Sequence, residues 1–344
     1  YNLTVSDNID WTGGVVSAAP GRASQPAEQA GALGMPFLTN QGTLELFGAG
    51  AKALNGAGLL NTGQANLESA AFSLGNGALF DNGAAGTFRV NGNYPVGAAG
   101  TGPNTFTNRG MFEKATEPGA ATIDAVFNNR GAVQVTNGTL VLNGGGAQSG
   151  SFTYAANTTL SIAAGTYQLD DGASFAGAGK LDIAAGVVIV NGNVPVSNLN
   201  LMGGAIGGLG TLVLTGSGTW SGGEMGEAGT TLLGTGATLN VTGPSAKTLD
   251  ARTFDNYGTF NLDSDQFFLS NQATFNNHFD GAWHMQGDHT VHSTGATPNV
   301  FHNFGVVHKD AGPGAAFFAP AFDNGGQVEV NSGSLGFAGG GNHT

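Results

Sequence analysis

Apolar residues alternate with polar ones over short stretches along most of the chain, and the stretches are separated by glycine, asparagine or both. In residues 127–146, for example, Val133 and Val135 flank Gln134. Alternation with a period of two predicts strands with one apolar face, and the Gly and Asn residues between them predict turns. The pattern therefore predicts strand, turn, strand, turn over most of the length.

The same grid of residues occurs twice, with an offset of 195 positions that needs no gap from about residue 38 to residue 149. Matching pairs include Leu44 with Leu239, Lys52 with Lys247, Lys114 with Lys309 and Leu140 with Leu335. We expect one continuous β-solenoid over 1–344, with copy 1 at about 1–149, intervening coils at 150–206 and copy 2 at about 207–344. Copy 1 has a surplus segment, 17–36, which is a candidate cap, clasp or contact with a neighbour; an ordinary surface loop is the alternative.

A shorter period lies inside each copy, marked by Phe-x-Asn followed by Gly and alternating apolar residues. Phe80, Phe106 and Phe127 follow one another at intervals of 26 and 21 residues, and copy 2 repeats both intervals. A period of this length is typical of a solenoid, in which each coil buries its apolar face by stacking on the next. The predicted fold is all-β, a right-handed parallel β-helix with coils of about 20–26 residues.

Equivalent residues of successive coils in such a fold lie above one another at roughly 4.8 Å, so like residues form columns. We expect an inward column of aromatic rings and a turn column of hydrogen-bonded amides. The predicted aromatic columns are Phe80, Phe106 and Phe127 in copy 1 and Phe275, Phe301 and Phe322 in copy 2. The predicted amide ladders are Asn82, Asn108 and Asn129 in copy 1 and Asn277, Asn303 and Asn324 in copy 2.

The composition agrees with a turn-rich all-β chain. There are 61 Gly among 344 residues, no Cys, and only 10% charged residues. Glycine supplies positive φ at corners, while short Val, Ile, Leu and Phe alternation supplies the inward wall. A solenoid grows along one axis, so this length requires no second core.

The third residue after each coil's Gly is expected to face solvent. This outward column comprises Asn66, Arg89, Glu113 and Gln134 in copy 1, and Asn261, His284, His308 and Glu329 in copy 2. Arg89 and Glu113 should form an ion pair between coils, of little energetic weight if exposed. His284, His308 and Glu329 could hold a divalent metal through imidazole and carboxylate. Flat β-surfaces rarely converge three ligands and copy 1 has no equivalent residues, so a solvated polar face is the alternative and no metal site is assigned.

Other candidate chemistry is sparse. Asp263 and Asp265 in "DSD", and Asp170 and Asp171 in "DD", could be paired carboxylates or calcium ligands, but such Asp residues in a Gly-rich β chain usually lie at turns. The absence of Cys excludes thiol catalysis and disulfides, and no phosphate loop, His-Glu-x-x-His or Gly-x-Ser-x-Gly motif occurs. With 10 Lys and Arg against 23 Asp and Glu, the surface should repel nucleic acid and anionic membranes. We predict no catalytic residues and no cofactor.

The strings "FNNRGAVQVTNGTLVLNGGG" (127–146), "GTFNL" (258–262) and "GTWSGGEMGEAGTTL" (218–232) resemble the repeats of very large bacterial surface proteins, including filamentous-haemagglutinin-like and autotransporter-passenger β-solenoids. The resemblance covers most of the chain and implies an extracellular stalk, adhesin or fibre component. The chain begins at Tyr1 without a leader and has no apolar span near twenty residues, which favours a processed piece of an exported protein at a bacterial cell surface.

Two functions of different classes remain open from the sequence. The first is a noncatalytic structural or adhesive solenoid that associates with itself through its open ends, because both ends of a β-helix expose unpaired strand edges; cell-surface glycans or a host surface are further candidate partners. The second is a polysaccharide lyase or glycoside hydrolase acting on an acidic glycan, since enzymes of this architecture gather carboxylates in one groove. Scattered acids and few basic residues favour the first.

Overall fold

The computed structural model describes residues 3–17 and 37–344, and within these ranges it contains strands and turns but no helix. Every strand pair is parallel, and each sheet takes every third strand in chain order. This is the topology of a β-solenoid with three parallel sheets, as the alternation of residues predicts. The surplus segment of copy 1 lies, from residue 18 onward, outside the described residues.

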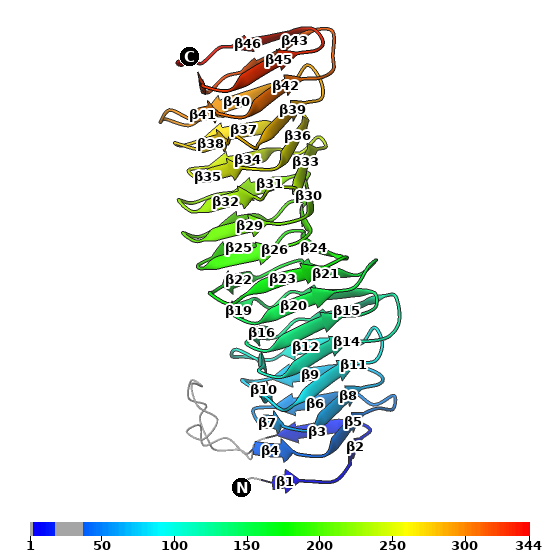
Figure 1. Cartoon of the computed structure of the whole chain (residues 1–344). Helices are drawn as coiled ribbons and strands as arrows, with labels where there is room; N and C mark the ends of the chain where they lie inside the picture. Colours follow the sequence, from blue (N-terminus) through cyan, green and yellow to red (C-terminus); the bar gives the residue numbers. More distant parts are fainter. Residues whose placement is uncertain (1–2, 18–36) are drawn as a thin grey trace. The chain divides into compact units, whose positions relative to one another are not determined.

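The chain forms two compact units, one comprising described residues up to Tyr167 together with 177–179, the other 168–176 together with 180–344. Figure 1 shows the stacked coils of each unit. The expectation of a single continuous solenoid stays a prediction. Strands β22 (Thr166–Leu169) and β23 (Ser174–Gly177) contain residues of both units.

Unit 1 builds its three sheets from strands of three or four residues. The first sheet contains β1 (Leu3–Val5), β4 (Phe37–Asn40), β7 (Gly58–Asn61), β10 (Leu79–Asn82), β13 (Thr105–Asn108), β16 (Val126–Asn129) and β19 (Gly146–Gln148). The second contains β2 (Ile9–Trp11), β5 (Thr43–Leu46), β8 (Gln64–Leu67), β11 (Thr87–Val90), β14 (Met111–Lys114), β17 (Ala132–Val135) and β20 (Ser151–Tyr154). The third contains β3 (Gly14–Ser17), β6 (Lys52–Asn55), β9 (Phe72–Gly75), β12 (Val96–Ala99), β15 (Ala120–Ile123), β18 (Thr139–Leu142) and β21 (Thr159–Ile162).

Unit 2 follows the same plan. Its first sheet contains β25 (Val187–Val190), β28 (Ala205–Gly207), β31 (Gly223–Met225), β34 (Lys247–Asp250), β37 (Phe267–Ser270), β40 (Thr290–Thr294), β43 (Ala315–Phe318) and β46 (Ser334–Phe337). The second contains β26 (Asn193–Val196), β29 (Thr211–Leu214), β32 (Thr230–Leu233), β35 (Thr253–Asn256), β38 (Thr274–Asn277), β41 (Val300–Asn303) and β44 (Ala321–Asn324). The third contains β24 (Lys180–Ile183), β27 (Leu199–Leu201), β30 (Ser217–Trp220), β33 (Thr238–Thr242), β36 (Thr259–Asp263), β39 (Ala282–Met285), β42 (Val306–Lys309) and β45 (Gln327–Val330).

The predicted aromatic columns occupy the core. In unit 1, Phe80 pairs with Phe106 and Phe106 with Phe127, and all three are fully buried. In unit 2 the rings of Phe275 and Phe301 stack at 4.9 Å with only 3° between their planes. Phe322 continues this column, 5.3 Å from Phe301. The core is thus a stack of side chains from successive coils, because each ring contacts the equivalent ring of the next coil.

The amide ladders are also present, and each unit's ladder is longer than the three residues predicted from the sequence. Nδ2 of each Asn donates to Oδ1 of the Asn one coil on, at distances of 2.7 to 2.8 Å. The ladder runs through Asn40, Asn61, Asn82, Asn108 and Asn129 in unit 1, and through Asn256, Asn277, Asn303 and Asn324 in unit 2. All of these side chains except Asn324 are fully buried. A buried amide without hydrogen bonds would be costly, so the fold requires the ladder's hydrogen bonds.

Some of the coils between the two sequence copies are shorter than the predicted 20–26 residues. Leu181 pairs with Leu199, only 18 positions further on, and Asn193 pairs with Thr211 at the same interval. Here two residues join β25 to β26, and two join β26 to β27. Corners of five residues occur in the two copies, for example 91–95 in copy 1 and 310–314 in copy 2.

Candidate functional site

The outward column of unit 1 has the register that the sequence predicts, but one member does not face solvent as expected. Asn66 is buried, only 6% exposed, because its side chain donates to the Glu45 carboxylate of the neighbouring coil at 2.8 Å. Arg89 pairs with Asn66 on one side and with Glu113 on the other, and Glu113 pairs in turn with Gln134. The Arg89 guanidinium lies 2.8 Å from the Glu113 carboxylate. Side chains of Arg89 and Glu113 are 39% and 16% exposed, so this ion pair contributes at most about 1 kcal/mol.

The outward column of unit 2 is likewise in register, with His284 between Asn261 and His308, and Glu329 after His308. The two imidazole rings stack at 4.7 Å with 10° between their planes. Nδ1 of His308 lies 3.2 Å from Glu329, as the register predicts. Stacked rings present faces and not nitrogens to one another. Within the described ranges, no three His, Cys, Asp or Glu side chains come together as a metal site.

Sequence reasoning missed the partner of His284. Its Nδ1 lies 2.7 Å from Oδ2 of Asp310, which stands just after β42 in the next coil. Burial alone would raise the pKa of Asp310, but hydrogen bonds from His284 and Asn331, together with the charges of His284 and His308, outweigh it and leave that pKa below its usual value. Because Asp310 follows the strand, it falls outside the alternation from which outward positions were predicted.

Imidazole–carboxylate pairs between neighbouring coils recur elsewhere in unit 2. His278 lies 2.9 Å from Asp255, and His302 lies 3.3 Å from Asp323. The equivalent positions of copy 1 carry no histidine: Gly83 stands for His278 and Thr107 for His302. The histidines of copy 2 therefore form part of a polar network specific to unit 2.

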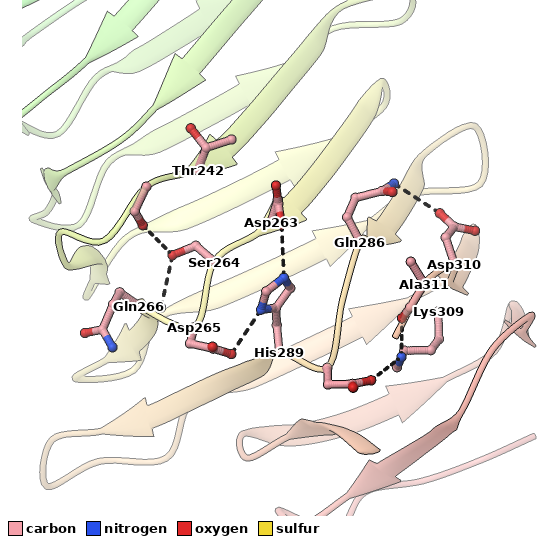
Figure 2. Close-up of polar contacts among 12 residues, drawn as sticks. Thr242, Asp263, Ser264, Asp265, Gln266, Gln286, His289, Lys309, Asp310 and Ala311 are labelled. Carbon is pink, nitrogen blue, oxygen red and sulfur yellow. Dashed lines mark hydrogen bonds and ion pairs between the residues drawn. The ribbon is translucent and has the colours of Figure 1, made fainter. Parts of the chain in front are cut away.

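The two aspartates of the "DSD" motif both contact His289. Oδ1 of Asp263 lies 3.2 Å from Nε2 of His289, and Oδ1 of Asp265 lies 3.0 Å from its Nδ1. Figure 2 shows the imidazole between the two carboxylates, in neighbouring coils of unit 2. Since both ring nitrogens already face a carboxylate, the cluster is a bridge between coils. In the "DD" motif, Asp170 accepts a hydrogen bond from Asn191 at 2.8 Å, and Asp171 lies in the turn that follows β22.

Between the two aspartates of this motif lies a serine with a buried lysine beside it. Nζ of Lys247 donates to Oγ of Ser264 at 2.6 Å, and both side chains are buried. Burial lowers the pKa of Lys247. A Ser–Lys pair can act as nucleophile and base. Here, however, the serine hydroxyl donates to the carbonyl of Gly243 at 2.9 Å, and the lysine also donates to that carbonyl at 2.7 Å. The Lys247 and Ser264 side chains therefore hold the loop at Gly243 in place.

Copy 1 repeats this loop closure at the matching positions. Nζ of Lys52 donates to the carbonyls of Gly48 and Ser69, at 2.8 and 2.9 Å, and the Ser69 hydroxyl also donates to Gly48. Lys114 and Lys309 form a second matched pair whose buried amines bind loop carbonyls. Recurrence in both copies favours a structural role for all four lysines.

Arg252 is a further buried cation that the sequence did not single out. Its guanidinium donates to the hydroxyl of Thr231 and to the carbonyls of Gly208, Gly226 and Thr230, at 2.9 to 3.2 Å. Burial lowers its pKa to about 10. With the four lysines, five of the chain's ten basic residues are fully buried, so the outer surface is more acidic than the net charge of −13 suggests.

Comparison with known proteins found no matching family model, no similar curated sequence and no similar solved structure. Over the described ranges there is no helix long and apolar enough to cross a membrane. The β-solenoid fold predicted from the repeats is thus supported by the structure, while the resemblance to bacterial surface proteins rests on the sequence.

Proposed function

We propose that this chain is a noncatalytic extracellular β-solenoid of a bacterial cell surface, a structural or adhesive module that stacks end to end into a stalk or fibre. The Gly, Asn and Thr-rich, Cys-free composition and the resemblance to bacterial surface repeats support the location. Many side chains form hydrogen bonds between coils, in the amide ladders and in the loops that the buried lysines bind. These contacts support a structural role.

The observation that carries the proposal is the surface of the last described coil. Val330, Leu335 and Phe337 occupy positions that pair with Lys309, Ala316 and Phe318, and all three partners are fully buried. Val330 itself is 48% exposed, and Leu335 and Phe337 are partly exposed.

Strands β45 and β46 are the last of their sheets, so one edge of each lacks a partner within the described chain. A surface of this kind accepts one further coil.

We assign that further coil to a second copy of the chain. The first described coil offers a complementary surface, since β1 to β3 are the first strands of their sheets and Leu3 and Val15 are 62% and 61% exposed. A contact between two different surfaces of one chain is heterologous, and where its rotation does not close a ring, repetition produces a linear assembly.

Sedimentation velocity and negative-stain imaging of the 344-residue chain over a concentration series test this proposal. We expect particle mass to grow with concentration and fibres of constant width to form. Val330→Asp places a carboxylate on the apolar end and should abolish growth, whereas Leu209→Asp, at a 78% exposed apolar position away from that end, should leave it unchanged.

Release of reducing ends from pectin-like or alginate-like polymers tests the enzymatic alternative. Turnover by the purified chain would favour a polysaccharide lyase or glycoside hydrolase and contradict the proposal. Particles of constant mass at all concentrations, or equal growth of the two variants, would contradict end-to-end stacking.

A further inference from the structure

The residue after each Asn of the amide ladder lies at a corner where two strands meet, and its chemistry differs between the copies. In unit 2 these corner positions carry Tyr257, His278 and Phe304, and the next residue after His278 is Phe279. We call these four residues the aromatic corner. In unit 1 the positions 195 residues earlier than Phe304 and Gly325 carry Arg109 and Arg130, which we call the arginine corner.

The aromatic corner is stacked and exposed. The rings of Tyr257 and His278 lie 4.0 Å apart with 6° between their planes, so the two coils present one continuous aromatic surface. Phe279 is 85% exposed and Phe304 is 53% exposed. Asp280, next to Phe279, is exposed as well, which adds negative charge beside an uncovered ring. Exposed aromatic groups gathered at one place mark an interaction surface.

The arginine corner presents positive charge, of which the surface of the described residues has little elsewhere. Arg109 binds the carboxylate of Asp81, and its side chain remains 44% exposed. Arg130 is exposed and makes no ion pair with any described residue. By contrast, Arg89 and Lys180 are each paired with a neighbouring acid.

We propose that the arginine corner of one molecule docks on the aromatic corner of a second copy, with the Arg130 guanidinium over the ring of Phe279 and near the carboxylate of Asp280. Arginine is the cation best suited to stack on an aromatic face while it pairs with a carboxylate. The two corners are different surfaces, so the contact is heterologous and open. The inference rests on the proposed self-association and adds a side contact to the end contact.

The experiment uses Val330→Asp as background, so that end-to-end stacking is blocked and only side contacts remain. Sedimentation equilibrium of this end-blocked protein should show association that rises with concentration and weakens with added salt. Arg130→Glu and Phe279→Ala should each weaken it roughly tenfold, the change expected for loss of one desolvated cation–π contact. Lys180→Glu and Leu209→Ala, an exposed cation and an exposed apolar residue elsewhere, are the matched controls and should leave it unchanged.

A double exchange, Arg130→Phe with Phe279→Arg, should restore association because it reverses the two roles. An end-blocked protein that stays monomeric, or that responds equally to Arg130→Glu and Lys180→Glu, would overturn the side contact. Growth of the wild-type protein into fibres would meanwhile leave the proposed function intact. If Phe279→Ala abolishes binding of a soluble neutral oligosaccharide and leaves the mass unchanged, the aromatic corner is a sugar platform and the inference is wrong.

Discussion

Asn277 and Asn303 lie one coil apart in β38 and β41, and Nδ2 of Asn277 donates to Oδ1 of Asn303 at 2.8 Å. The same nitrogen donates its second hydrogen to the carbonyl of Val306 at 3.0 Å. On its other side, Oδ1 of Asn277 accepts from Asn256 at 2.7 Å. Each amide therefore ties three coils together while it is shielded from water, where an unpaired polar group would be costly.

The first prediction follows from this ladder. Asn277→Ala leaves the amide of Asn256 and the oxygen of Asn303 without their partner, and we expect a loss of about 3 kcal/mol in the free energy of unfolding, from two buried groups at roughly 1–3 kcal/mol each. Urea denaturation followed by tryptophan fluorescence measures it. The control is Asn193→Ala, at an exposed strand position, which should change the free energy by less than about 0.5 kcal/mol. Equal losses in both variants would show that the ladder does not stabilise the fold.

The second prediction concerns the aromatic column. Phe301 is fully buried, and its ring lies 4.9 Å from the rings of Phe275, Trp283 and Phe318. Phe301→Ala opens a cavity in a stack that has no room to collapse, and should cost about 3–5 kcal/mol. Tryptophan emission, to which the neighbouring Trp283 contributes, reports the change during unfolding. Phe279→Ala removes the same ring from an exposed site and should be nearly neutral; a comparable loss there would contradict a core role for the column.

The periodicity of the sequence was sufficient to predict the solenoid, the aromatic columns and the register of the outward columns, because a coil fold repeats its chemistry at every turn. It was not sufficient to predict exposure at each position, since Asn66 is buried. The ladder members Asn40 and Asn61 were missed, since Leu38 and Leu59 stand there in place of the phenylalanine that marks the motif. Asn256 does follow the motif, after Phe254, so the sequence was sufficient to predict this member of the ladder although it was left out.

The buried lysines could not be predicted from residue type, because lysine ordinarily marks a solvated position. Their burial follows from loops that turn carbonyl oxygens inward, as the bonds from Lys247 to Thr242 and Gly243 demonstrate. The one available signal was recurrence: Lys52 matches Lys247 at the 195-residue offset. The contact of Asp310 with His284 was also not predicted, because Asp310 lies in a loop, where apolar and polar residues do not alternate as they do in a strand.

A third prediction tests why glycine follows the ladder at the corners. A Cβ on Gly305 would lie 2.2 Å from the carbonyl oxygen of Gly281 and 2.3 Å from that of His278, so the coils approach too closely for a side chain. Gly305→Ala should therefore destabilise unit 2 by several kcal/mol, about the cost of overpacking a rigid backbone contact or more. Gly97→Ala is the matched control, because its Cβ would meet nothing closer than Ser73 at 3.8 Å. Thermal melts followed by circular dichroism should separate the two, and a harmless Gly305→Ala would refute the close approach.

The last prediction concerns acid stability and the pair formed by His284 and Asp310. Because the pKa of Asp310 is lowered in the folded chain, the folded state keeps this carboxylate ionised at pH values where the unfolded chain has begun to take up the proton. The stabilisation is thus fully present above the unfolded pKa, near 3.8, and is lost as the pH falls through the lower folded value. We expect Asp310→Asn to be less stable than wild type at pH 5, and the gap to narrow towards pH 3.

Urea denaturation at several pH values across this window measures the gap directly. Asp280→Asn serves as the comparison, since Asp280 is exposed and has no ion pair with a described residue, and its difference from wild type should stay constant with pH. A gap for Asp310→Asn that is equally constant would mean that its hydrogen bonds from His284 and Asn331 do not favour the ionised form, and that the network between these coils depends on packing alone.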